Sequence, residues 1–235
     1  MAFNMRDRRY RCSAARNEAL ERLTDLKAGA TAASKRSIPL QVREMTFQSA
    51  IFQASSTLEE YLKQIFDHWL YELKRHGLTG GNIPSRARFS YFGRELSKAF
   101  SWYVYAGDEK DLATKLEEKS NIIEFAMGNS GVLPYLTGEF AYKDRKYPSP
   151  QNIKSLYSRI GCDNIFDRLS REMKSDAHLK LQGFNDIRSS IAHGTPPDLT
   201  LLDVRRNLGD VALFIKSLDK INHREFSKHF GGGVW

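Results

Sequence analysis

The most regular feature of this 235-residue chain is a run of apolar residues spaced three or four positions apart between residues 41 and 75. This spacing places the apolar side chains on one face of a helix with 3.6 residues per turn. The residues that follow the pattern are Phe47, Ile51, Ala54, Leu58, Tyr61, Ile65, Trp69 and Leu73. The pattern predicts one long amphipathic helix from Gln41 to Arg75, which ends at the glycine-rich segment 77–84.

Weaker patterns of the same period predict further helices on both sides of this one. The expected helices span Arg6–Lys27, Phe89–Tyr103, Asp108–Ala126 with Asp108 as N-cap, Asn152–Ile160, Asn164–Lys174, Asp176–His193 and Leu201–Leu218. The Gly- and Pro-rich segment 128–150 predicts an ordered loop, with a short hairpin as the alternative. No segment alternates apolar and polar residues for more than about five positions. The sequence therefore predicts an all-α fold built on an antiparallel helical bundle.

Small residues and a proline between Gly29 and Pro39 separate the first predicted helix from the long one. Three glycines, Gly231 to Gly233, lie near the C-terminus, where chain ends commonly fray. We therefore expect a basic helical arm at residues 1–39, a helical domain at 40–225 and a flexible tail at 226–235.

The composition indicates which partners and which cell compartment to expect for this chain. The chain has 36 Lys and Arg against 28 Asp and Glu, a formal charge of +8, which favours encounters with polyanions such as nucleic acid. Its two cysteines, Cys12 and Cys162, form no CxxC motif, which argues for a reducing compartment and against structural zinc. No apolar run is long enough for a membrane helix, and no apolar segment follows the basic N-terminus as a secretory signal requires. We expect a cytoplasmic protein that does not enter a membrane.

Common cofactor and hydrolase motifs (GxxxxGK[ST], GxGxxG, HExxH and GxSxG) do not occur, and no histidines pair at metal-ligand spacing. We therefore expect neither a cofactor nor a metal. The best candidates for chemistry are Arg188 and His193, which have four residues between them at the end of a predicted helix and are followed by Gly194. Two similar pairs exist, Arg171 with His178 and Arg224 with His229.

Both candidate residues also have ordinary structural interpretations. A protonated His193 would be stabilised by the helix dipole at a C-terminus, and Arg188 could pair with Asp186. On an ideal helix five residues place the two side chains roughly 140° apart, so a single chain does not bring them together. Glu59 falls on the apolar side of the long helix with Phe52, where a carboxylate normally needs a partner. The partner we expect is an Arg or His on the 176–193 helix, in a structural or a catalytic role.

Three patches of the chain resemble the RiboL-PSP-HEPN group of the HEPN superfamily. They are Leu58-Glu59 on the long helix, Gly161 with Asn164-Ile165-Phe166 between two short helices, and the Arg188-to-Gly194 ending RSSIAHG. The apolar Ile187 and Ile191, and Gly194 directly after the histidine, favour Arg188 and His193 over the other two pairs.

The resemblance implies a helical fold and a metal-independent endoribonuclease, typically a toxin or antiviral defence effector. Arg188 would hold the scissile phosphate and His193 would act as general base or acid, which leaves 2′,3′-cyclic phosphate ends. It also implies a two-fold homodimer that gathers both residues into one cleft, an RNA substrate and, for a toxin, an antitoxin partner.

The chain departs from the family pattern directly after the arginine. The family commonly has Asn, Asp or His there, whereas this chain has Ser189, so Asn185 and Asp186, one turn earlier, are the alternative polar supports. The departure leaves open a catalytically silent HEPN-like module that binds RNA, a nucleotide or a protein. An ordinary helical interaction protein, in which the Arg and His are incidental, is the third interpretation.

Overall fold

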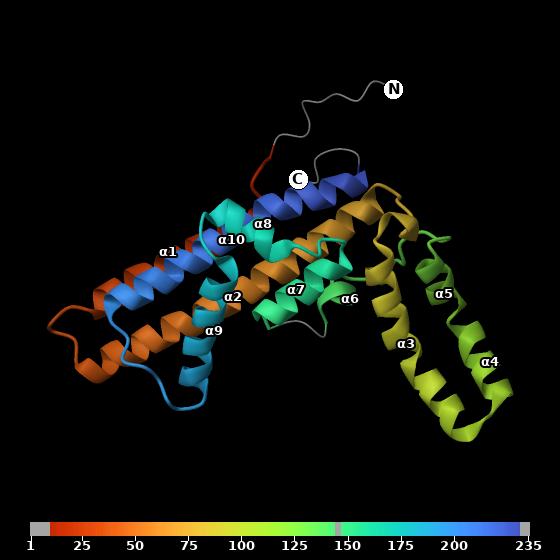
Figure 1. Cartoon of the computed structure of the whole chain (residues 1–235), viewed down its shortest axis with the longest axis horizontal. Coiled ribbons are helices and arrows are strands. Elements are labelled where there is room, and N and C mark those ends of the chain that lie inside the picture. The colour runs from red at the N-terminus through yellow and green to blue at the C-terminus, as the bar shows by residue number, and fades with distance from the viewer. Residues whose placement is uncertain (1–9, 144–146, 231–235) are drawn as a thin grey trace.

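A computed structural model describes residues 10–143 and 147–230, and only the backbone of residues 229 and 230. Three long helices lie side by side in it, α1 (Ala14–Ala33), α2 (Leu40–Arg75) and α10 (Leu201–Phe230), and form the longest part of the molecule (Figure 1). The described residues contain one isolated β-bridge, Thr79 with Gly131, and no other strand pairing. The predicted all-α fold is confirmed.

The predicted helix at residues 41–75 is confirmed as α2, which begins one residue earlier at Leu40. All eight residues of its apolar pattern are buried. Trp69 stacks on Phe226 of α10 with the ring centres 4.9 Å apart. The helix ends at His76, and Gly77 follows with a positive φ of 62°. Few residues other than glycine adopt that conformation readily, which explains why the helix stops there.

Helix α1 differs from the helix expected at Arg6–Lys27. Its N-cap is Ser13, whose hydroxyl accepts a hydrogen bond of 3.0 Å from the Arg16 amide. The predicted break at Gly29 is wrong, because the helix continues through it to Ala33. Ala30 and Ala33 are buried against the bundle, and this packing outweighs the cost of about 1 kcal/mol for a glycine inside a helix. The start predicted at Arg6 lies outside the described residues.

Helices α3 (Ser85–Ala106) and α4 (Glu109–Glu118) form a hairpin that projects from the bundle (Figure 1). Asp108 caps α4 as predicted, through a hydrogen bond of 2.9 Å from the Asp111 amide. The single helix expected to reach Ala126 is divided at Lys119, and α5 (Ser120–Met127) follows. The 128–150 segment forms a loop with one short helix, α6 (Glu139–Tyr142), and its described residues contain no hairpin.

The remaining helices bring the candidate residues against the bundle. They are α7 (Pro150–Arg159), α8 (Ile165–Met173) and α9 (Ala177–Ala192), all within two residues of their predicted bounds. Helix α9 crosses the bundle and contacts α2, α8 and α10 (Figure 1). A continuous chain then leads through Pro196 and Pro197 to α10.

Helix α10 begins with Thr200 and Asp203, whose side chains each accept a hydrogen bond from the other residue's backbone amide. It runs 12 residues beyond the predicted end at Leu218, to Phe230. Phe226, the first residue of the expected flexible tail, is fully buried, so the first part of that segment belongs to the core. Residues 231–235 lie outside the described part of the chain.

A buried carboxylate joins the two ends of the described chain. Asp219 on α10 is fully buried and accepts hydrogen bonds from the Ser13 hydroxyl at 2.5 Å, the Ser13 amide at 3.1 Å and the Tyr10 hydroxyl at 2.8 Å. Leu23, Ala30 and Ala33 of α1 are part of the same hydrophobic core as α2 and α10. Whether residues 1–39 form a separate arm stays a prediction, but α1 shares the core of the bundle. None of the described helices combines the length and the apolar character needed to cross a membrane.

Candidate active site

The candidate site lies at the C-terminal half of α9. The helix begins at Asp176, whose side chain accepts from the Leu179 amide at 2.9 Å, and its buried residues include Leu181 and Phe184. Ile187 and Ile191 pack, partly buried, against the core. This apolar stripe fixes the rotation of α9 and therefore the direction of the polar residues between its members.

Arg188 is half-buried between two aromatic rings. Its guanidinium carbon lies 5.2 Å from the centre of the Phe52 ring on α2 and 5.0 Å from the centre of the Tyr147 ring. Each cation–π contact is worth about 0.5–2 kcal/mol. The two ring contacts restrict the side chain, so that the guanidinium is oriented before any ligand arrives.

No carboxylate among the described residues compensates this guanidinium. Arg188 makes no ion pair with Asp186 or any other described residue, and its Nε–H is buried without a hydrogen-bond partner among residues 10–143 and 147–230. Asp186 instead accepts a hydrogen bond of 2.7 Å from Gln182 and is exposed. A buried orphan donor is rare in native proteins and needs an explanation. A bound anion would satisfy it.

Asn185 holds Tyr147 in the position from which its ring contacts Arg188. It is 5% exposed, and its side-chain oxygen accepts a hydrogen bond of 3.0 Å from the Tyr147 hydroxyl. Its amide nitrogen donates to the Pro148 carbonyl at 3.1 Å. Burial raises the pKa of Tyr147, while the charge of Arg188 lowers it and that of Asp186 raises it, so the hydroxyl remains a donor at neutral pH. Asn185 therefore fixes the ring that stacks on Arg188.

His193 is the C-cap of α9, and its side chain is exposed. Gly194 follows with φ of 76° and donates to the Ile191 carbonyl at 3.3 Å, while the Thr195 amide donates to Ser190 at 3.0 Å. This is a Schellman turn, which requires a residue tolerant of positive φ after the cap. The predicted helix end at His193 is confirmed, and the turn projects the imidazole at the edge of the fold.

Within one chain, no hydrogen bond or ring contact joins Arg188 and His193. Ser189 is half-buried between them, and its carbonyl accepts the His193 amide at 3.0 Å. No group of three or more His, Cys, Asp or Glu side chains among the described residues is arranged to hold a metal ion.

The expected environment of Glu59 is wrong. Its side chain is 30% exposed rather than buried, and it pairs with Lys63 on the same helix at 3.0 Å. Lys63 also lies 3.9 Å from Glu60. The helical pattern placed Glu59 correctly beside apolar residues. The expectation of a partner on α9 did not take account of Lys63, one turn later on the same helix. The expected Arg or His partner on α9 is not found.

The sequence did not predict the contacts of Arg188 with the rings of Phe52 and Tyr147. The helical pattern places Phe52 beside Glu59 but does not indicate a contact with α9. Tyr147 lies in the loop before α7, where periodicity gives no information. The sequence contains one usable signal, an aromatic residue directly before Pro148-Ser149-Pro150, a segment that starts a helix.

A family model described as RiboL-PSP-HEPN matches residues 14–221 of the chain. The match includes α1 as well as the helices that carry Arg188 and His193. Neither the curated proteins nor the solved structures contain a significant match to the chain.

Proposed function

We propose that this chain, which belongs to the RiboL-PSP-HEPN family, is an endoribonuclease that cleaves RNA without a metal and uses Arg188 and His193. The observation that carries the proposal is the state of Arg188. Its guanidinium is held between Phe52 and Tyr147 with no carboxylate partner among the described residues. A structural arginine at this depth normally has an acidic partner. An arginine that binds a phosphate does not need one before the substrate arrives.

The other two Arg–His spacings have less suitable surroundings. Arg224 pairs with Glu172 at 2.6 Å, so its charge is already compensated. The Nε of Arg171 donates to the Asp167 carbonyl at 3.2 Å on its own helix, and His178 packs edge-on against Phe166. Among the described residues, Arg224 is thus already compensated, and Arg171 is exposed without a ring contact, whereas Arg188 combines an unpaired charge with two ring contacts that orient it.

The proposed reaction starts at the ribose 2′-hydroxyl. His193 takes the hydroxyl proton as the 2′-oxygen attacks phosphorus, the bond from phosphorus to the 5′-oxygen breaks, and that oxygen leaves with a proton. The products are a 2′,3′-cyclic phosphate and a 5′-hydroxyl. Arg188 binds the non-bridging oxygens and stabilises the negative charge that grows on them.

The site is proposed to form between two copies of the chain. Arg188 faces α2 and Tyr147, whereas His193 is exposed at the end of α9. Since one chain does not bring these groups together, a two-fold dimer of α9 ends would place the arginine of one chain near the histidine of the other. Each of the two sites then pairs the arginine of one chain with the histidine of the other, and the leaving 5′-oxygen takes its proton from water.

The test is incubation of purified protein with a mixed RNA pool in EDTA, followed by analysis of the fragment ends. The proposal predicts cyclic phosphate and 5′-hydroxyl ends, resistance of 2′-O-methylated RNA and no cleavage of DNA. Activity that EDTA abolishes and magnesium or manganese restores would contradict the mechanism. Binding without cleavage would favour the alternative, a catalytically silent module for RNA, a nucleotide or a protein.

A toxin or defence role makes a further prediction. Expression of the wild-type protein should arrest cell growth, whereas expression of the His193→Ala variant should not.

A further inference from the structure

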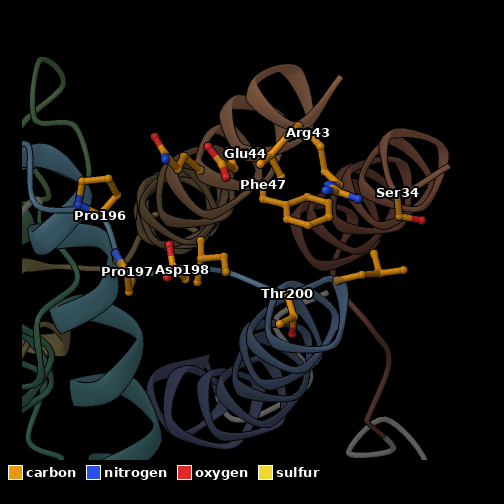
Figure 2. A pocket seen from close by; sticks show the side chains of 12 residues that line it. Ser34, Arg43, Glu44, Phe47, Pro196, Pro197, Asp198 and Thr200 are labelled. Atoms are coloured by element: carbon orange, nitrogen blue, oxygen red, sulfur yellow. The ribbon is translucent and has the colours of Figure 1, made fainter. Parts of the chain in front are cut away.

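A pocket of about 500 Å³ opens between the start of α2, the end of α1 and the segment from Pro196 to Thr200 (Figure 2). Its volume lies within the range of ~300–1,000 Å³ that is typical of small-molecule sites. Phe47, which is 3% exposed, contributes an aromatic ring to it. Figure 2 shows Arg43 and Glu44 on the α2 side and Asp198 on the facing segment.

The pocket lies next to the proposed catalytic residues. Glu44, Gln48 and Phe52 follow one another at intervals of four on α2, so the pocket residues share a helix face with the ring that stacks on Arg188. Gln48 and Phe52 are about 6 Å apart along the helix axis. On the other side Pro196 is three residues from His193, a separation of at most about 11 Å. The pocket thus adjoins, on both sides, the segments that carry the proposed site.

Ser34 and Thr200 of the pocket lining bond to their own segments, Ser34 to the Thr31 carbonyl and Thr200 to Asp203, whereas four longer polar side chains lack a partner among the described residues. Arg43, Glu44, Gln48 and Asp198 make no side-chain hydrogen bond or ion pair with any residue in the described ranges. The pocket contains one arginine and two carboxylates, so its net charge does not favour a phosphate group. An uncharged group with both donors and acceptors on its edges fits these side chains better.

We infer that this pocket binds an unpaired guanine base of RNA next to the scissile phosphate, an inference that rests on the proposed function. Sequence-specific proteins recognise single-stranded RNA in part by hydrogen bonds to the edges of splayed bases, and the pocket offers such bonds, while the buried Phe47 forms part of its apolar floor. Guanine has two adjacent acceptors, O6 and N7, which match the donors of an arginine such as Arg43. It also has two adjacent donors, N1–H and the 2-amino group, which match a carboxylate such as Glu44 or Asp198. Adenine, cytosine and uracil lack one or both of these adjacent pairs.

The test uses oligouridine RNAs that each contain one guanine, adenine or cytosine. Cleavage beside the single base is compared with cleavage between uridines in the same molecule, so the ratio does not depend on the amount of active protein. In the wild type we expect cleavage beside guanine to exceed cleavage between uridines by about 10-fold or more. Glu44→Gln and Asp198→Asn should reduce this ratio at least several-fold. Glu21→Gln, an exposed residue of α1 outside the pocket, makes the same change of charge as Glu44→Gln and should leave the ratio unaltered.

A binding measurement separates failure of this inference from failure of the proposed function. The full-length His193→Ala variant is titrated with the same RNAs and bound RNA is followed by fluorescence anisotropy, so no cleavage is needed. Tighter binding of the guanine RNA that is lost in the Glu44→Gln and Asp198→Asn variants supports the pocket even if no RNA is cleaved. Equal affinity for all the RNAs, or a guanine preference that survives both substitutions, would overturn the inference.

Discussion

The guanidinium carbon of Arg188 lies 5.0 Å from the ring centre of Tyr147, a residue 41 positions earlier in the sequence. The ring in turn is held by Asn185, which accepts a hydrogen bond from the Tyr147 hydroxyl at 3.0 Å. Arg188 is therefore oriented by a residue of its own helix that acts through a loop. The arrangement makes Asn185 a positioning residue, with consequences that can be measured.

We expect Asn185→Ala to lower kcat for RNA cleavage more than it raises KM. The substitution leaves the Tyr147 hydroxyl and the Pro148 carbonyl without their partner, so the free energy of unfolding should fall by about 1–3 kcal/mol. Activity is measured well below the new midpoint of thermal unfolding, so that any loss reflects position rather than unfolding. Gln182→Ala, an exposed change one turn earlier on α9, is the matched control and should affect neither quantity.

Arg188→Lys and His193→Ala should each abolish cleavage. Lysine keeps the positive charge but lacks the planar group that stacks between two rings and binds two phosphate oxygens. His193 is exposed and packs in no core, so the midpoint of thermal unfolding of its variant should stay within a few degrees of wild type. If His178→Ala silences the protein instead, the proposed pair is wrong.

Mixing two inactive variants tests the shared site. Arg188→Ala supplies an intact histidine and His193→Ala an intact arginine. Random exchange of subunits would make about half of the molecules heterodimers, each with one complete site out of two, so about a quarter of wild-type activity should return. No recovery after subunit exchange, or an active species that light scattering shows to be a monomer, would contradict a site composed of two chains.

Glu59→Gln should change the free energy of unfolding by less than about 1 kcal/mol, and no more than Glu60→Gln does. Both side chains are partly exposed and both lie near Lys63, and exposed ion pairs of this kind contribute little. Chemical denaturation of both variants gives the comparison. Selective loss of cleavage in Glu59→Gln, with unchanged stability, would instead restore a direct role for this carboxylate at the site.

Glu225→Gln should destabilise the protein at neutral pH by about 1–3 kcal/mol, since the buried carboxylate accepts hydrogen bonds from Lys228 and Arg168. Burial raises the pKa of Glu225, but these two partners outweigh burial, and the net pKa is lowered. A lowered pKa in the folded state gives stability that is full above the ordinary value of about 4.3 and is lost as the pH falls through the folded value. The difference between wild type and variant should therefore shrink below about pH 4, as measured by urea unfolding at several pH values.

The sequence predicted those parts of the fold in which one helix carries a long, regular apolar pattern. Helix α2 was located to within one residue because nearly every turn contributes a buried side chain. The end of α9 was located because Gly194 is the residue that a left-handed turn requires. The break at Gly29 failed because the packing of Ala30 and Ala33 against other helices decides that region, and a local pattern does not contain it.

The same distinction applies to the candidate site. Arg188 and His193 were found from their spacing and their place at a helix end. Tyr147 was not found, since its contact with α9 spans a loop that no period describes. The environment of Glu59 was predicted wrongly because a helical pattern shows which residues share a face. The exposure of the Glu59 side chain depends instead on which other elements pack against that face. The pocket at Arg43 combines two segments, 43–48 and 196–201, that are at least 148 positions apart, and no local pattern joins them.

The bonds between Ser13 and Asp219 connect residues 206 positions apart. During synthesis on a ribosome, α1 and α2 emerge well before the carboxylate that fixes the start of α1. At ~5–20 residues per second, the first helix waits about 10–40 s for it. In that interval the faces of α1 and α2 that α10 will cover remain open to solvent and to chaperones. The nascent chain thus completes its bundle only after α10 has been synthesised.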